Sequence, residues 1–410
     1  MLPSAVVADE PLRLVFDEIT GVVQQEFYDK SVAVEEFPQI AARYREQLIA
    51  NPGRDFAELV NRMLGELNAS HTHYYTPDDY GYQHLAAIFQ FIKPIRALYP
   101  DGVTYTTAGI ITEVIDGKTF IVSVLSGSRA EEAGLQSGDE IVSADGQPFG
   151  PVSSFRGKAG QPVKLLIRRT ADGPVEPVSV RPEELEPKAE NLAAEKESVR
   201  VVDVQGVKIA YIHVWSYAGT EYQEVFEDAL LSPDVRQADA LIWDLRFGWG
   251  GANVEYLRVF SDDLPKFVVI DREGESKEFE TRLAQRADGS PVREYPLWTK
   301  PAVMLTNRRV RSGKELLAHG FKSREIGSIV GESTMGATLG GRLFVLSNDA
   351  ILYVAVMDTR IDGERLEGQG VKPDIVVPHD VRYTAGADPQ YDRAVDLLVE
   401  ELRPATPTAR

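Results

Sequence analysis

The sequence predicts a multi-domain α/β protein, in which a helical N-terminal part precedes a small β domain and a layered α/β core. Three observations lead to this prediction. The chain has 410 residues, which exceeds the length served by one ordinary hydrophobic core. Its apolar spacing changes from helical to strand-like near residue 100. From residue 207 onward, short apolar runs alternate with amphipathic ones, as strands and helices do in a largely parallel sheet.

Residues 1–100 are predicted to form the helical N-terminal domain. Apolar side chains recur there at helical spacing in two stretches, namely Leu14, Val15, Ile19 and Val22, and Phe56, Leu59, Val60, Met63 and Leu64. The turn residues Pro100, Asp101 and Gly102 then introduce β-type runs such as residues 119–125. A second domain, residues 101–186, is therefore expected to start at this turn.

The second domain contains the string SGSRAEEAGLQSGDEIVSADGQPF at residues 126–149. It predicts a short helix over Arg129–Ala133 that ends at Gly134, and a strand over Glu140–Ala144. The string resembles the central part of PDZ domains in bacterial proteases, although another small β-barrel is an alternative. Residues 182–200 are charged and weakly structured by composition, so a linker is expected over residues 187–206.

Residues 207–410 are predicted to form the α/β core. The expected strands are residues 207–214, 238–245, 301–307 and 328–331, and the expected helices are Glu221–Leu231, Val254–Phe260 and Glu315–Phe321. Loops that bind or react gather at the carboxyl ends of parallel strands. The residues that follow these strands are therefore the candidates for chemistry.

Composition excludes several function classes. The formal net charge of −19 disfavours nucleic acid as a partner, because binding to phosphates draws on lysine and arginine. The absence of cysteine excludes disulfides, thiolate metal sites and cysteine nucleophiles. No apolar run is long enough to span a membrane. Residues Ala5–Ala8, followed by Asp9, resemble the end of a trimmed signal peptide, which leaves an exported and a cytoplasmic location equally open.

Ser312 stands in the string VMLTNRRVRSGKELLAHGFK, where a predicted strand turns into a helix that begins near Gly313. A serine there presents its hydroxyl beside the free N–H groups of a helix N-terminus, which suit a developing oxyanion. Serine is also a common helix N-cap, and its spacing to Glu315 fits a capping box. From this string alone, the cap is the stronger interpretation.

Three further segments change that judgement: GELNASHTHYY at 65–75, ALIWDLRFGWGGANVEYL at 240–257, and VGESTMGATLGG with DGERLEGQGVKPDIVV at 330–341 and 362–377. Together with the serine string, they resemble in order and spacing the tail-specific (C-terminal processing) and tricorn-core superfamily of serine peptidases. The resemblance spans roughly residues 10–400. It implies an α/β core of the crotonase- or Clp-like layered type, with Ser312 as the nucleophile.

On this resemblance, His71 is the general base, because its motif matches the histidine of tricorn-like members. Imidazole suits the role, since its ordinary pKa lies near neutrality. Ser70 and Glu367 match the serine and glutamate that complete a Ser-His-Ser-Glu tetrad. A metal site built on His71 and His73 is an alternative, but a catalytic zinc needs a third ligand and no HExxH motif occurs.

The sequence departs from the Ser-Lys members of the superfamily. Those members carry a lysine in a Thr-x-Gly-Lys string, whereas this chain has Thr334-Met335-Gly336-Ala337. Lys314 is a poor substitute, because two positions along a helix direct its side chain away from Ser312. The histidine mechanism is therefore the consistent prediction.

The resemblance also implies an oxyanion hole in which an N–H of Gly250 or Gly251 joins that of Gly313. A glycine-rich phosphate loop is the alternative, but GWGG lacks both a Walker lysine and dinucleotide spacing. Glycine at these positions permits close approach of the backbone.

The predicted function is a serine endopeptidase or carboxyl-terminal processing peptidase that needs no cofactor. The PDZ-like domain implies binding of a free peptide or unfolded protein C-terminus by strand addition, with its carboxylate near Thr107, Ala108, Gly109 and Ile110. Oligomers are compatible with this prediction. The alternatives are a non-catalytic binding protein on the same scaffold and a hydrolase of non-peptide esters or amides.

Overall fold

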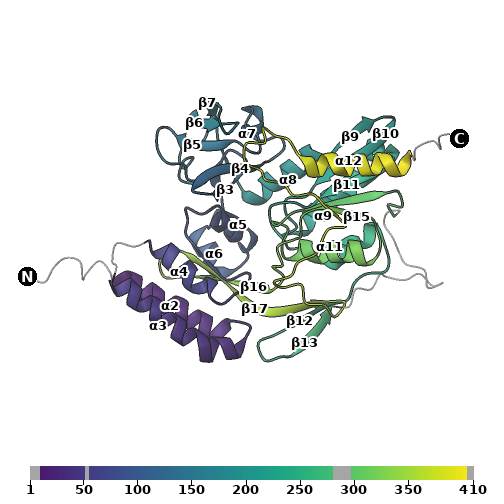
Figure 1. The fold of residues 1–410 in the computed structure, drawn as a ribbon. Coiled ribbons are helices and arrows are strands. Elements are labelled where there is room, and N and C mark those ends of the chain that lie inside the picture. Colours follow the sequence, from purple (N-terminus) through teal and green to yellow (C-terminus); the bar gives the residue numbers. More distant parts are fainter. Residues whose placement is uncertain (1–9, 51–54, 280–296, 404–410) are drawn as a thin grey trace, which may run out of the picture. The chain divides into compact units, whose positions relative to one another are not determined.

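The computed structural model describes residues 10–50, 55–279 and 297–403, which form two compact units (Figure 1). The first unit contains the described residues of Met1–Val103, Lys266–Glu280 and Gly336–Gln369. The second contains those of Thr104–Pro265, Thr281–Met335 and Gly370–Arg410. The stretch Ala5–Ala8 lies outside the described residues. Within the described part of the chain, no helix is both long and apolar enough to cross a membrane.

The first unit combines the predicted N-terminal helices with an antiparallel sheet. The helices are α2 (Glu10–Glu26), α3 (Phe37–Ala50), α4 (Phe56–Gly65), α5 (Tyr80–Ile88) and α6 (Lys93–Leu98), with a π-helical segment η1 (Val32–Glu36) before α3. The strands are β1 (His73–Tyr75), β12 (Phe267–Ile270), β13 (Ser276–Phe279), β16 (Gly340–Val345) and β17 (Ile351–Ile361). Their order is β1-β17-β12-β13, and β16 also pairs with β17. Phe16, Ile19 and Met63 belong to the same buried core as the strand residues Leu352 and Val354.

The second unit begins with the predicted small β domain. Its five strands lie in the order β3 (Ile110–Ile115), β4 (Lys118–Val124), β5 (Glu140–Ala144), β6 (Val163–Arg168) and β7 (Glu176–Val180), and neighbours are antiparallel. The short helix α7 (Arg129–Glu132) starts at the N-cap Ser128, and Gly134 follows it at φ +75°. A separate pair joins β2 (Tyr105–Thr107) to β8 (Glu183–Leu185). Because β3 is an edge strand of the five-stranded sheet, its outer side suits strand addition.

The α/β core follows in the same unit. Its sheet has the order β18 (Ile375–Val376), β15 (Ser328–Gly331), β14 (Ala302–Thr306), β11 (Ala240–Asp244), β10 (Val207–His213) and β9 (Arg200–Val204). All neighbours are parallel except β9 and β10. The helices are α9 (Thr220–Leu231), α10 (Pro233–Gln237), the 3₁₀ helix η2 (Val254–Val259), α11 (Gly313–Ser323) and α12 (Pro389–Leu402).

Both faces of this sheet are covered by helices, as continuous apolar strands require. Ile242 and Leu305 form one buried cluster with Leu398 of α12, the yellow helix in Figure 1. Trp243, the next residue along β11, points to the opposite face, where its ring contacts Phe226 of α9 and Phe321 of α11. The layered α/β core that the sequence predicts is therefore present.

The weakly structured linker predicted over residues 187–206 is wrong. This segment forms the helix α8 (Pro187–Ser198) and the strand β9. Composition misled the prediction because α8 buries acidic side chains. Glu190, for example, accepts hydrogen bonds from the Tyr105 hydroxyl at 2.6 Å and from the Thr107 hydroxyl at 2.9 Å.

Candidate active site

Ser312 lies in the turn that joins β14 to α11. Its backbone has φ +57° and ψ −134°, a region that residues other than glycine rarely adopt. Ser312 is the N-cap of α11, and the predicted capping box with Glu315 is present. An ordinary N-cap serine has angles of the β region, so the cap alone does not explain this backbone conformation. The carboxylate of Glu315 accepts a hydrogen bond from the Ser312 amide at 3.3 Å and helps to hold the turn. A strained strand-to-helix turn is the setting in which hydrolases expose a nucleophilic serine.

A glycine loop, residues 247–251, packs against this turn. A Cβ atom added at Gly250 would lie 2.4 Å from the Ser312 Cβ and 3.0 Å from the Gly313 nitrogen. A Cβ at Gly313 would lie 2.3 Å from the Ala252 nitrogen. Glycine is therefore required at both positions, and the backbones of the two segments approach each other beside Ser312.

Gly251 occupies a different place in the loop. A Cβ on Gly251 would lie 2.7 Å from the Tyr217 carbonyl oxygen, in the segment that follows β10. That segment also supports the loop through hydrogen bonds from the Trp249 amide to the Trp215 carbonyl, at 2.7 Å, and from the Tyr217 amide to the Gly250 carbonyl, at 3.0 Å. Of the two glycines predicted for an oxyanion hole, Gly250 is therefore the one that packs on Ser312.

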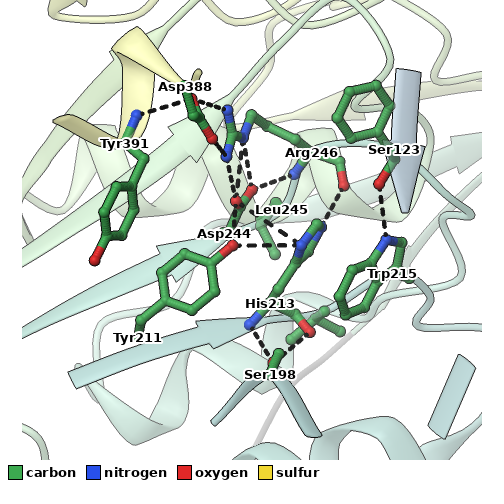
Figure 2. A network of polar contacts seen from close by, with 12 residues as sticks. Ser123, Ser198, Tyr211, His213, Trp215, Asp244, Leu245, Arg246, Asp388 and Tyr391 are labelled. Carbon is green, nitrogen blue, oxygen red and sulfur yellow. Dashed lines mark hydrogen bonds and ion pairs between the residues drawn. The ribbon is translucent and has the colours of Figure 1, made fainter. Parts of the chain in front are cut away.

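A buried polar network fixes the strand end that carries the glycine loop (Figure 2). The Arg246 guanidinium forms ion pairs with Asp244, at 2.7 Å, and with Asp388, at 2.6 Å. Burial opposes ionisation of Asp244, but the Arg246 charge holds the pKa of this carboxyl well below its usual range. The Tyr211 hydroxyl donates to Asp244 at 2.8 Å. The Asp-Leu-Arg motif thus anchors the start of the glycine loop.

His213 belongs to this network as a neutral side chain. Burial lowers its pKa to about 4, and its Nε2 donates to the Arg246 carbonyl oxygen at 2.9 Å. Its ring stacks on Trp215 with a centroid distance of 3.6 Å (Figure 2). These contacts and its burial make His213 a core residue.

The first unit holds the three other predicted catalytic residues together. The Ser70 hydroxyl lies 3.0 Å from His71 Nδ1 and donates to Glu367 Oε2 at 2.9 Å. The Ser70 amide donates to the other carboxylate oxygen at 2.8 Å. His71 has φ +55°, and it lies just before β1, which pairs with β17. Two residues that are adjacent in sequence thus meet a carboxylate from the far end of the chain.

The hydrogen bonds around Glu367 define the tautomer of His71. Glu367 is buried, and its Oε2 also accepts from the amides of Thr338, at 2.8 Å, and Leu339, at 3.2 Å. A carboxylate that accepts from several N–H groups is ionised and cannot donate, so Ser70 uses its single proton on Glu367. His71 Nδ1 must then donate to the Ser70 oxygen. In the neutral imidazole, the basic lone pair therefore lies on Nε2.

His73 is the histidine of the metal alternative, and it lies in β1 with an exposed side chain. Its ring contacts that of Tyr75 at a centroid distance of 4.5 Å. Among the described residues, no group of three histidine or acidic side chains is arranged to hold a metal ion.

Comparisons with known proteins find related peptidases. Models of peptidase family S41 and of the PDZ domain match residues 208–377 and 120–169. The carboxyl-terminal-processing protease of Synechocystis sp. is 25% identical over 97% of this chain and 88% of its own length. The tricorn protease of Thermoplasma volcanium is 21% identical over 95% of this chain but only 36% of its own length. The structure of the photosystem II D1 C-terminal processing protease matches with a TM-score of 0.53, at 19% identity, over 95% of this chain and 99% of its own.

The chain matches peptidase family S41 over residues 208–377, and its relatives support the tail-specific serine peptidase superfamily. It is therefore a serine peptidase on a multi-domain α/β scaffold with a PDZ domain. Ser312, Gly250 and Gly313 belong to its second unit, and Ser70, His71 and Glu367 belong to its first.

The predicted carboxylate-binding residues of the PDZ domain run from the end of β2 to the start of β3. The Gly109 amide donates to the Thr107 hydroxyl at 3.0 Å, and the carbonyls of Ala108 and Gly109 accept from the amides of Ala130 and Leu125. Ile110 begins the edge strand β3. A cavity of about 320 Å³ borders residues 107–109, on the side where α8 lies. A peptide carboxylate at this loop would compete with Thr107 for the Gly109 amide.

Sequence reasoning missed the contacts that support the glycine loop of the peptidase. Lys314 is completely buried, and its ammonium binds three backbone carbonyls at the base of the loop. Phe247, which opens the loop, has φ +60°. The one signal in the sequence was a lysine in the first turn of a helix, where the helix dipole disfavours a positive charge.

Proposed function

We propose that this peptidase cleaves peptide bonds near the carboxyl ends of unfolded proteins or peptides, with Ser312 as nucleophile and His71 as general base. The observation that carries the proposal is the strained turn at Ser312, next to Gly250 and the first amide of α11. A nucleophile in such a turn is exposed, and the adjoining N–H groups suit the oxyanion of acyl transfer.

In the proposed mechanism, the Ser312 oxygen attacks the peptide carbonyl carbon while Nε2 of His71 takes the hydroxyl proton. The N–H groups of Gly313 and Gly250 bind the carbonyl oxygen as it becomes negative. When the tetrahedral intermediate collapses, the C–N bond breaks and His71 returns the proton to the leaving amine. Water then hydrolyses the acyl-enzyme with the same base.

The relay from Ser70 to Glu367 supports the choice of His71. The ionised carboxylate compensates the positive charge that His71 acquires, and the Ser70 oxygen keeps the proton on Nδ1. Ala337 stands where the Ser-Lys members carry their basic lysine, so the histidine is also the base that the sequence provides.

Substitution of the nucleophile tests the reaction. Ser312→Ala should abolish turnover of an unfolded protein substrate and of a short peptide. Its stability should change by about 1 kcal/mol at most, because this serine contributes no more than a helix cap. Ser323→Ala, at the exposed end of the same helix, is the matched control and should retain activity. Retained peptide turnover by folded Ser312→Ala would reject the nucleophile, and turnover of esters alone by the wild type would favour a non-peptide substrate.

Recognition of a free carboxyl end is the second part of the proposal. It rests on the edge strand β3 and the preceding loop, and on the names of the relatives, which are carboxyl-terminal processing proteases. A peptide with a free C-terminus should be cleaved with kcat/KM about tenfold higher than its C-terminal amide, since a charged hydrogen bond is worth about 1.5–3 kcal/mol. Equal values for the acid and the amide would contradict this part alone.

A further inference from the structure

A buried lysine lies beneath the glycine loop in a position that the reaction described above does not use. Lys314 is the second residue of α11, and its side chain is completely buried. Its Nζ donates to the carbonyl oxygens of Val214, at 2.6 Å, Leu245, at 3.2 Å, and Phe247, at 2.9 Å. An ammonium has three N–H donors, and these three contacts occupy all of them.

The three carbonyls belong to the two segments that shape the glycine loop. Val214 follows β10, and its segment continues to Trp215 and Tyr217, which bind the loop backbone. Leu245 and Phe247 follow β11 and lead directly into Gly248 and Gly250. Buried backbone carbonyls need hydrogen-bond donors. The Lys314 ammonium supplies a donor to each of these three carbonyls and so links the two segments.

The contact with Phe247 concerns the conformation of the loop itself. Phe247 has φ +60°, which is unfavourable for an aromatic residue, and Gly248 follows with φ +69°. The hydrogen bond from Lys314 fixes the peptide group between these two residues. The orientation of the next peptide groups, and so the approach of Gly250 to Ser312, depends on this bond.

A role as a general base does not fit Lys314. Burial lowers its pKa to about 7, which is a property of catalytic lysines. The carboxyls of Asp244 and Glu195 oppose this shift, and Arg311 adds to it. The three partners of Nζ, however, are backbone carbonyls. They have no proton that a base could remove, and each of them stabilises the protonated form of Lys314.

We propose that Lys314 is a positioning residue that holds the glycine loop in its catalytic conformation by binding the carbonyls of Val214, Leu245 and Phe247. This inference rests on the proposed oxyanion role of Gly250. Its signature is a loss of transition-state stabilisation without a loss of substrate binding.

Lys314→Met, which keeps the length of the side chain but removes the charge, tests the proposal. We expect kcat for a peptide to fall at least 100-fold, the scale on which removal of an oxyanion donor acts, while KM changes less than about threefold. Lys322→Met changes a half-exposed lysine on the same helix, paired with Asp374, and should leave both constants unchanged. A kcat within threefold of the wild type in Lys314→Met would overturn the proposal. Failure of this variant to fold would overturn it too, because the lysine would then be a requirement of the fold.

Chemical rescue separates charge from shape. The chain contains no cysteine, so Lys314→Cys can be alkylated at a single site in the unfolded state and then refolded. Alkylation with bromoethylamine restores an ammonium at nearly the length of lysine, and should recover at least one-tenth of the kcat of refolded wild type. Alkylation with iodoacetamide gives a neutral control that should remain inactive. Equal activity of the two products would overturn the proposal.

Ser312→Ala, assayed alongside, distinguishes the two levels of inference. If Ser312→Ala is inactive while Lys314→Met has normal kcat, only the role of Lys314 fails. If Ser312→Ala itself turns over peptide, the proposed function fails first.

Discussion

Two histidines of this peptidase have similar partners but carry their protons on different ring nitrogens. His71 contacts the Ser70 hydroxyl, which donates to Glu367, and His213 lies near the Tyr211 hydroxyl, which donates to Asp244. Each imidazole thus faces a hydroxyl that is bonded to a carboxylate. The difference arises at the remaining contacts.

A different contact decides the tautomer of each histidine. His213 Nε2 must donate to the Arg246 carbonyl, so its proton is fixed on Nε2. His71 carries its proton on Nδ1, because the single hydroxyl hydrogen of Ser70 is already used in the hydrogen bond to Glu367. Only the tautomer of His71 leaves a basic lone pair on Nε2, the nitrogen that does not contact the hydroxyl.

The carboxylates differ as well. Asp244 is neutralised by the Arg246 guanidinium, whereas Glu367 is held by backbone amides of Ser70, Thr338 and Leu339. Burial is the main cause of the low pKa of His213, the Asp244 charge raises this pKa, and the Arg246 charge lowers it further. The comparison teaches that a nearby carboxylate alone does not make a histidine basic, because burial and the charge beside the carboxylate also act on it.

Of the histidine substitutions, His71→Ala should lower kcat most. If it does not, the proposed difference between the two histidines is wrong. His71→Ala should lower kcat by at least about 10², the lower end for loss of general-base assistance. His213→Gln, which keeps a donor for the Arg246 carbonyl, should retain most of the turnover. Steady-state rates at saturating peptide, with circular dichroism to check folding, decide between them. Near-normal turnover in folded His71→Ala would remove the proposed base.

The pH dependence of the free energy of unfolding should reveal the protonation of His213. Its folded pKa of about 4 lies below the unfolded value of about 6.5, so the unfolded chain binds the proton first as pH falls. The contribution of neutral His213 is fully present above pH 6.5 and is lost between pH 6.5 and 4. Wild type should lose about 2 kcal/mol more than His213→Gln between pH 7 and pH 5. Urea denaturation at the two pH values measures this difference, and parallel losses would show that His213 is not held neutral.

His73→Ala is expected to have the smallest effect. The His73 side chain is exposed on β1, and its ring contact is with Tyr75. Its kcat should therefore stay within about threefold of the wild type, far from the loss expected for a general base. A loss comparable to that of His71→Ala would reopen a joint role of the two histidines in binding a metal ion.

Local signals in the sequence predicted much of the fold. The strands Glu140–Ala144 and 328–331 appear with the predicted bounds, because turn residues flank them and their apolar content is high. The helix α8 was missed, since its acidic residues find partners only in the folded chain. The pairing of β1 with β17 was missed for a related reason, because it joins residues as far apart as His73 and Tyr353.

The candidate site residues that lie in recognisable sequence motifs could be predicted. Ser312 and the Ser70-His71 pair could be found from their strings, and Glu367 from its place in the closing motif. The tautomer of His71 and the proposed role of Lys314 could not be found in this way. Both depend on backbone groups, such as the amide of Thr338 and the carbonyl of Phe247, whose direction is set by distant parts of the chain.

The discontinuous first unit has a consequence for the order of synthesis. Its helices leave the ribosome early, but their core is completed by β17, and the relay carboxylate of Glu367 comes later still. At about 5–20 residues per second, roughly 15–60 s separate the emergence of His73 from that of its partner Tyr353. The nascent chain therefore carries His71 without its relay carboxylate until Glu367 has been synthesised. The proposed base is in this way incomplete for as long as β17 and the segment after it are still to be made.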